Sequence, residues 1–401
     1  MEKLNYYILR RTKKIKTFSY SHPTEIQFGC GKFNELGKIA TRFGKRCLLV
    51  TIKPFPEMEP IFKKVKALLE AEGIQVAHFD GVEPNPTTEV ISKGAKLARE
   101  HKAEMVIGLG GGSSMDSAKA IAVEATHEGS CWDYLFFKTP PTVKTLPIIA
   151  VTTTSGTGSE VTQVAVITKT DEHCKSALYN SILFPRVAIV DPELNMTIPP
   201  QGTSPTGFDA FTHAFEAYLH PNASPYTDIL AIEAMRLVVH NLPIAIKDGK
   251  NIEARSAMAW ASTLGGLSIA NAGVTLPHGM GMAISGIWPN IAHGQSLAIV
   301  YPSFTRFTYE SAIDRFATMA RIFDPSLNAV DNKTAAHKSC ELIDNFLKSI
   351  NLWFSLKDFG ATADQLLELA TASMVLPDYK SNPRVATKEE MFKIAKECYQ
   401  Q

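Results

Sequence analysis

Asp209 and His213 form the first pair of side chains in this chain that could do metal chemistry. They lie four positions apart in GFDAFTHAFEAYL (207–219), whose apolar residues predict a helix, so both would project from the same helical face. A single aspartate–histidine pair is more typical of a hydrogen bond than of a metal site. The pair by itself leaves both interpretations open.

Two further histidines favour the metal site. His278 and His293 lie within residues 256–305, a stretch without Asp, Glu, Lys or Arg that is typical of a buried environment. A buried imidazole without a partner is costly, and the neutral imidazole is the commonest metal ligand. One carboxylate and three imidazoles, from Asp209, His213, His278 and His293, would suit Fe2+ or Zn2+ and leave room for a substrate oxygen.

The same charge-free stretch could in principle cross a membrane. Pro277, Pro289 and Pro302, with repeated Gly and His, interrupt every candidate span of about 20 apolar residues. We therefore expect interior helices and loops of a protein domain, and no membrane partner.

The glycine-rich segment GLGGGSSMDSAK (108–119) could bind a phosphate. A buried strand, EMVIGLG (104–110), precedes it, and a helix with Ala118, Ile121 and Ala122 on its apolar side follows. The first N–H groups of a helix are unsatisfied and attract anions, and glycines let a pyrophosphate approach them. Ser113 replaces the last glycine of the GxGxxG fingerprint, so a tight turn with Ser113 as the helix N-cap is the alternative.

A second polar turn, VTTTSGTGSEVT (151–162), also follows a predicted strand. Alone it would indicate an ordinary Ser/Thr turn. Because ligands collect at the carboxyl edge of a parallel sheet, two such turns together favour a nucleotide site.

The elements that must position these residues change type along the chain. Strand and helix patterns alternate in the first half, which predicts a doubly wound parallel α/β sheet; the predicted strands are 46–52, 75–80, 104–110, 147–152 and 187–190. After the Pro-, Gly- and Ser-rich segment 190–207, helical patterns dominate. We predict an α/β dinucleotide-binding domain at 1–198 and an all-α metal-binding and catalytic domain at 199–401.

Composition limits the classes of partner. The 401 residues favour two domains, and 41 basic against 40 acidic side chains give no electrostatic reason to expect nucleic acid. The six cysteines lack close spacing and are interpreted as free thiols in a reducing compartment, with the cytoplasm as the default. The basic segment MEKLNYYILRRTKKIKTF (1–18) is interpreted as a surface arm or edge strand rather than a signal peptide.

Several motifs together resemble those of the iron-containing alcohol dehydrogenase family, a branch of the superfamily that includes glycerol dehydrogenase and dehydroquinate synthase. They occur in order over almost the whole chain after the basic arm: PTEIQFGCG (23–31), VEPNPTTEV (82–90), GGGSSMDSAKA (110–120), TTTSGTGSEVT (152–162), VAIVDPEL (187–194), GFDAFTHAFEAY (207–218), PHGMGMAISG (277–286) and SNPRVATKEEM (381–391).

The resemblance implies an NAD(P)-linked alcohol dehydrogenase or aldehyde reductase with a divalent ion, and a homodimer. It assigns the metal to the same four residues, Asp209, His213, His278 and His293. The metal would lower the pKa of a substrate alcohol, and the nicotinamide would accept the hydride. The resemblance also implies the cofactor contacts Gly111, Gly112, Ser113, Asp116, Thr153, Thr154, Thr157 and Lys175.

The chain departs from the family pattern at two places. Many relatives have a histidine where this chain has Met282, so a proton would need another route, such as ribose hydroxyls or water. Where many NAD-preferring relatives have an aspartate that bonds the adenosine ribose, this chain has Ile52 followed by Lys53, which leaves NAD or NADP open. The apolar Phe208, Phe211, Ile287 and Trp288 point to small aliphatic alcohols or aldehydes.

Two alternatives remain at this point. One is a zinc-dependent polyol dehydrogenase of the glycerol type, or the lyase chemistry of dehydroquinate synthase; the fourth ligand and the motifs of the helical half argue against both. The other is a regulatory protein that binds metal and nucleotide without turnover, for which Met282 is the only indication.

Overall fold

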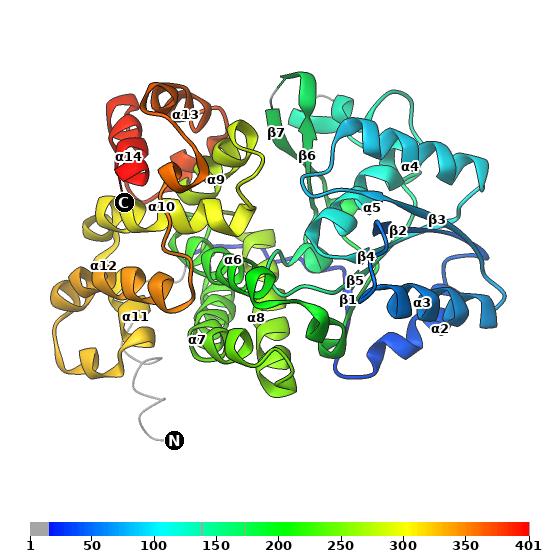
Figure 1. Cartoon of the computed structure of the whole chain (residues 1–401), viewed down its shortest axis with the longest axis horizontal. Coiled ribbons are helices and arrows are strands. Elements are labelled where there is room, and N and C mark those ends of the chain that lie inside the picture. Colours follow the sequence, from blue (N-terminus) through cyan, green and yellow to red (C-terminus); the bar gives the residue numbers. More distant parts are fainter. Residues whose placement is uncertain (1–15, 138, 173, 401) are drawn as a thin grey trace.

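The computed structural model describes residues 16–137, 139–172 and 174–400 (Figure 1). The first 15 residues of the predicted surface arm or edge strand lie outside this part of the chain. At its described end, Lys16 Nζ donates to Pro221 O (3.1 Å), so the arm meets the helical half of the molecule.

A parallel sheet forms the core of the first half, as predicted, and it has six strands rather than the five that the sequence indicated. Its strands lie in the order β1–β8–β5–β4–β2–β3, and every neighbouring pair is parallel. The bounds are β1 (Glu25–Phe28), β2 (Arg46–Ile52), β3 (Gln75–Val82), β4 (Met105–Gly110), β5 (Ile148–Thr152) and β8 (Val187–Val190). Parallel strands need crossover connections, and here these are largely helices.

Both faces of this sheet are covered because its strands are apolar on both sides. On β2, Leu48 and Val50 pack in one cluster with α4 and α5, whereas Cys47 and Leu49 pack in another with α2 and α3. Successive residues of a strand point to opposite faces, which explains the near-continuous apolar run RCLLVTI. The covering helices are α2 (Leu36–Ala40), α3 (Glu59–Ala71), α4 (Thr88–Glu100) and α5 (Gly112–Glu124).

Three strands were not predicted from the sequence. β1 is short and lies at the sheet edge beside β8, and β6 (Val164–Lys169) and β7 (Cys174–Tyr179) form a separate antiparallel hairpin. The hairpin contacts α5 and α9, so it connects the glycine-rich turn to the helical half (Figure 1).

The strand order also determines where a ligand should bind. From β2 the chain crosses to β3 on one side and then to β4 on the other, so the topological switch point lies between β2 and β4. Ligands of open α/β sheets bind at the carboxyl ends of the strands at such a point. The glycine-rich turn after β4 and Ile52 at the end of β2 both lie there.

The second half is helical, as predicted. Its helices are α6 (Pro200–Leu219), α7 (Pro225–Lys247), α8 (Ile252–Asn271), α9 (Leu276–Ile287), α10 (His293–Thr308), α11 (Ile313–Phe323), α12 (Asn332–Ser349), α13 (Leu366–Ala372) and α14 (Lys388–Gln400). α6 lies at the centre, between the sheet and the outer helices (Figure 1).

α7 is the one helix among the described residues that is long and apolar enough to cross a membrane by length and composition. It packs against α6 and α8 and buries Ala231, Ala234, Met235, Val238 and Leu242 in the helical core.

The two halves pack closely where the second polar turn meets α6 and α8. A Cβ atom on Gly156 would collide with the backbone of Thr206, and one on Gly266 would lie 2.7 Å from Gly158 O. Gly158 also has φ 61°, which a side chain would strain. These contacts place the turn after β5 directly against the helix that carries Asp209 and His213.

Candidate metal and cofactor site

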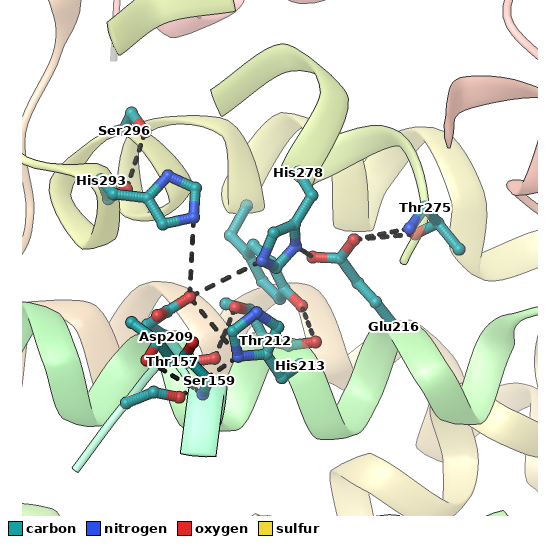
Figure 2. Close-up of polar contacts among 12 residues, drawn as sticks. Thr157, Ser159, Asp209, Thr212, His213, Glu216, Thr275, His278, His293 and Ser296 are labelled. Atoms are coloured by element: carbon teal, nitrogen blue, oxygen red, sulfur yellow. Dashed lines mark hydrogen bonds and ion pairs between the residues drawn. The ribbon is translucent and has the colours of Figure 1, made fainter. Parts of the chain in front are cut away.

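Three acidic or imidazole side chains lie on one face of α6. Asp209, His213 and Glu216 follow a spacing of four and then three residues, which aligns side chains along a helix. All three are buried, and Figure 2 shows them facing His278 on α9. Glu216 was not identified from the sequence, although its spacing from Asp209 and His213 could have indicated it.

The predicted metal ligands converge on one oxygen atom. Asp209 Oδ1 lies 3.6 Å from His278 Nε2, 3.7 Å from His213 Nδ1 and 3.8 Å from His293 Nε2 (Figure 2). His278 comes from the first turn of α9 and His293 from the start of α10, so three helices supply the group.

The four residues do not lie equally close together. Asp209, His278 and His293 each offer a ligand atom within 4.8 Å of the other two. His213 lies beside this group: its ring stacks on His278 with centroids 4.6 Å apart, and its Nδ1 is 3.2 Å from Gly156 O. The structure thus brings three predicted ligands into one group and places the fourth next to it.

The site favours positive charge. Burial acts to raise the pKa of Asp209, but His213, His278 and His293 outweigh it and lower that pKa. Burial acts to lower the pKa of His278, yet Glu216 and Asp209 raise it to about 10. Burial lowers the pKa of His293 to about 3 and also lowers that of His213. Asp209 and Glu216 therefore stabilise positive charge at His278, whereas burial favours the neutral form of His213 and His293, in which an imidazole binds a metal.

Unpaired buried atoms support the same conclusion. Asp209 Oδ1 and His278 Nε2, which face each other, are buried and have no hydrogen-bond partner. Such atoms are rare in proteins, and a bound ion is one explanation for them. A carboxylate and imidazoles are a donor set that iron and zinc accept, so these residues fit the ion that the sequence predicted. The His293 side chain is 28% exposed, against 4% for Asp209, so the site opens on the His293 side.

The glycine-rich turn presents a bare helix N-terminus. α5 begins at Gly112, its N-cap is Gly111, and no side chain caps it. The alternative in which Ser113 caps the helix is therefore wrong, and Ser113 lies in the first turn instead. Uncapped N–H groups at this position are free to bind an anion.

The two polar turns pack against each other. A Cβ on Gly111 would lie 3.1 Å from Thr154 Cγ2, and one on Gly112 would lie 2.7 Å from Thr157 Cγ2. Thr153 N also donates to Gly110 O (2.9 Å). Both glycines are therefore required for packing of the two turns, and the approach of a pyrophosphate stays a prediction.

Asp116 lies on α5 with both carboxylate oxygens engaged by the protein. Oδ1 accepts from Ser159 Oγ (2.6 Å), and Oδ2 accepts from Val166 N (2.9 Å). Lys119 Nζ, fully buried, lies 3.9 Å from Asp116 Oδ1 and donates to Ser159 O (2.7 Å). Asp116 therefore fixes the turn after β5, and Lys119, which the sequence analysis did not single out, shares that role.

Lys175 and Ile52 lie on different strands. Lys175, on β7, donates from Nζ to Asn85 Oδ1 (2.8 Å), and burial lowers its pKa to about 8. Ile52 ends β2 and pairs with Val82 of β3. Ile52 thus ends a strand that neighbours β4, and Lys175 lies on the separate β6–β7 hairpin.

The aromatic residues expected to indicate the substrate belong largely to the core. Phe208 and Phe211 are fully buried, and both rings pack against Tyr301 and Phe346. These two residues therefore fill the helical core and do not indicate the substrate. Trp288 is also buried in this core, and Ile287 packs against it.

A parallel α/β domain joined to a helical domain, with a group of potential metal ligands beside a glycine-rich turn, is compatible with a metal-dependent, nicotinamide-linked oxidoreductase. Family models confirm this class: the iron-containing alcohol dehydrogenase model matches residues 23–192, and the model for the C-terminal part of the Fe-containing alcohol dehydrogenase family matches residues 203–399. The chain belongs to the iron-containing alcohol dehydrogenase family and is a metal-dependent, NAD(P)-linked alcohol dehydrogenase.

Individual relatives agree over almost their full length. The chain is 34% identical to choline dehydrogenase of Bacillus subtilis, with 96% of each chain covered. It is 33% identical to 1,3-propanediol dehydrogenase of Klebsiella pneumoniae, covering 96% of this chain and 99% of that one. The crystal structure of the archaeal Red Sea brine pool alcohol dehydrogenase ADH/D1 superposes with a TM-score of 0.92 at 35% identity, over 96% of this chain and 100% of that chain.

Proposed function

We propose that Asp209, His278 and His293, completed by His213, hold the Fe2+ or Zn2+ of this alcohol dehydrogenase. The observation that carries the proposal is the convergence of three imidazole nitrogens within 3.6–3.8 Å of Asp209 Oδ1. When bound, a divalent ion polarises the oxygen of an alcohol or carbonyl, and the nicotinamide carries the hydride.

The protein's own residues supply position and charge. Asp209 contributes the negative charge that would hold a cation where three helices meet. Its Oδ1 has no hydrogen-bond partner and is therefore available to that cation. The exposed edge of His293 leaves one side open, which we assign to the substrate. We propose that the substrate is a small alcohol or its aldehyde.

The cofactor site lies, in this proposal, at the carboxyl ends of β2, β4 and β5. Gly111, Gly112 and Ser113 would receive the pyrophosphate, and Thr153, Thr154 and Thr157 would contact the cofactor from the facing turn. Lys175 and Asn85 would lie on the ribose side, and Ile52 beside the adenosine. The switch point between β2 and β4 supports this placement. Asp116 acts in it by fixing the turn through Ser159.

Metal content and hydride transfer test the proposal together. Asp209→Asn and His293→Ala should each lose bound iron or zinc and NAD(P)H-linked oxidation of alcohols, while binding of NADH, followed by its fluorescence, persists. Asp228→Asn, on the neighbouring helix α7, is the control for a lost carboxylate. Retention of stoichiometric metal by Asp209→Asn would refute the ligand assignment.

The remaining expectations are also proposals. We place the boundary between the two domains at residues 198 and 199, just before α6 begins at Pro200. We also propose a homodimer and a cytoplasmic location. Light scattering after gel filtration tests the first of these two, and cell fractionation tests the second.

A further inference from the structure

Glu216 is a fully buried carboxylate whose two oxygens serve different donors. Oε1 accepts from His278 Nδ1 at 2.7 Å, and Oε2 accepts from Thr275 N at 2.8 Å and from Thr275 Oγ1 at 3.3 Å (Figure 2). Its exposure is 0%. The side chain therefore acts only as an acceptor, toward a ring nitrogen on one side and a peptide N–H on the other.

These bonds fix the start of α9 on α6. Thr275 is the N-cap residue of α9, and His278 lies in the first helical turn. No side chain within that segment caps the helix. The carboxylate of Glu216 satisfies the N–H of Thr275 and orients the ring of His278 at the same time, so the backbone and the ring cannot move independently.

The orientation of the ring determines which nitrogen faces Asp209. With Nδ1 directed at Glu216, His278 presents Nε2 to Asp209 Oδ1 at 3.6 Å, and this Nε2 has no hydrogen-bond partner. A neutral imidazole that donates from Nδ1 has its lone pair on Nε2. Carboxylates that hold a histidine ring in this way raise its basicity as a metal ligand.

We propose that Glu216 is a positioning residue that keeps the Nδ1–H tautomer of His278 and so makes Nε2 available to a divalent cation. The inference rests on the proposed function, because it assigns His278 to the metal. Glu216 would thus support the metal site while contacting neither the ion nor the substrate.

A glutamine at this position cannot replace the carboxylate. If the amide NH2 faces Thr275, two donors oppose each other at the N-cap of α9. If it faces His278, Nδ1 must become the acceptor, and the proton moves to Nε2, where it blocks the metal. Either orientation disturbs the site, whereas the side-chain volume is almost unchanged.

The test compares Glu216→Gln with Glu124→Gln as a matched control. Glu124 is also buried, and its Oε2 accepts from Cys131 N (2.8 Å), at the far end of α5. We expect Glu216→Gln to weaken Zn2+ and Co2+ binding by about 10- to 100-fold, measured by competition with a chromophoric chelator. The absorption spectrum of bound Co2+ should change as well. Glu124→Gln should bind both ions like the wild type.

The outcomes separate this inference from the proposed function. If the wild type binds no divalent ion, the proposed function fails. If the wild type binds Zn2+ and Glu216→Gln binds it within twofold, with NADH binding intact in both, the role of Glu216 is refuted.

A measurement on the wild type covers the case in which Glu216→Gln does not fold. In the Zn2+-loaded protein labelled with 15N-histidine, His278 should show a protonated Nδ1 and a coordinated Nε2. Coordination through Nδ1, or a protonated Nε2, would overturn the inference.

Discussion

Gly112 and Thr157 pack so closely that a methyl group on Gly112 would lie 2.7 Å from Thr157 Cγ2. The two residues belong to the turns after β4 and β5, which are proposed to receive the cofactor from opposite sides. The spacing between the turns is therefore set by a glycine that has no room for a side chain.

Gly112→Ala should push the turn at 153–158 away from α5. Overpacking of this kind costs about 1–3 kcal/mol, and we expect a corresponding loss of NAD(P)H affinity, measured by fluorescence titration. Thr157→Ser removes the Cγ2 atom and keeps the hydroxyl, so Gly112→Ala/Thr157→Ser should regain part of that affinity. Equal affinities for the single Gly112→Ala and the double variant would exclude the steric explanation.

The buried ion pair between Lys119 and Asp116 should behave as a unit. Lys119 Nζ donates to Ser159 O, Ser159 Oγ, Thr162 Oγ1 and Val164 O, and it is fully buried. Lys119→Met removes one of the two ammonium groups, with Lys175, that act on the Asp116 carboxylate. Breaking a buried pair from one side costs about 3–5 kcal/mol.

Urea denaturation measures this coupling. The double variant Lys119→Met/Asp116→Asn should lose less stability than the sum of the two single variants, because it removes both charges of the pair together. If the loss of stability in the double variant equals the sum of the losses in the two single variants, the two groups do not interact.

Cofactor preference should depend on Lys53. This exposed residue follows Ile52 at the end of β2, beside the switch point, where an acidic residue would repel the 2′-phosphate of NADP. Lys53→Asp should shift the ratio of kcat/KM for NADP+ over NAD+ toward NAD+ by about tenfold, or about 1.4 kcal/mol. The ratio for Lys53→Ala should lie between those of the wild type and Lys53→Asp. Lys96→Asp on α4 controls for the change in net charge, and a ratio that is the same in all four proteins would remove Lys53 from the cofactor site.

His220 should make the fold sensitive to acid. Burial lowers its pKa from 6.5 to about 4. Its Nδ1 accepts from Asn222 N at 3.0 Å, which only a neutral ring can do. As the pH falls from about 6.5 to about 4, the unfolded chain binds the proton first, so the free energy of unfolding decreases in this window and is fully retained above it.

His220→Asn isolates this effect, because an amide oxygen can accept from Asn222 N without titrating. Between about pH 7 and about pH 4.5, the free energy of unfolding of the wild type should fall by about 1–2 kcal/mol more than that of the variant. The difference is this small because solvent partly screens the half-buried ring. Parallel pH profiles from chemical denaturation at several pH values would contradict the prediction.

Part of the candidate metal group could be predicted from the sequence, because spacing along a helix depends only on neighbouring residues. Asp209 and His213 lie four apart on a helix, and Glu216 continues the same face; that spacing is readable without a structure. The charge-free stretch also marked His278 and His293 as interior. The alternation of buried strands and helices likewise indicated the parallel sheet, since that pattern depends on short-range periodicity.

The strands that escaped prediction lack such a signal. β6 and β7 form a hairpin whose pairing is made outside the main sheet, and β1 has only four residues at a sheet edge. Weak apolar alternation over so few residues does not distinguish a strand from a loop.

The sequence by itself determined the residue types for a cation site, the glycine-rich turn and the order of the elements, because these follow from local spacing. Only the tertiary structure decided that Asp209 Oδ1 is the shared point of three imidazoles and that Glu216 holds His278. It also showed that Gly111 and Gly112 face Thr154 and Thr157. The physical reason is that these contacts join segments far apart in the chain, whose distances are set by the packing of α6, α9, α10 and the sheet.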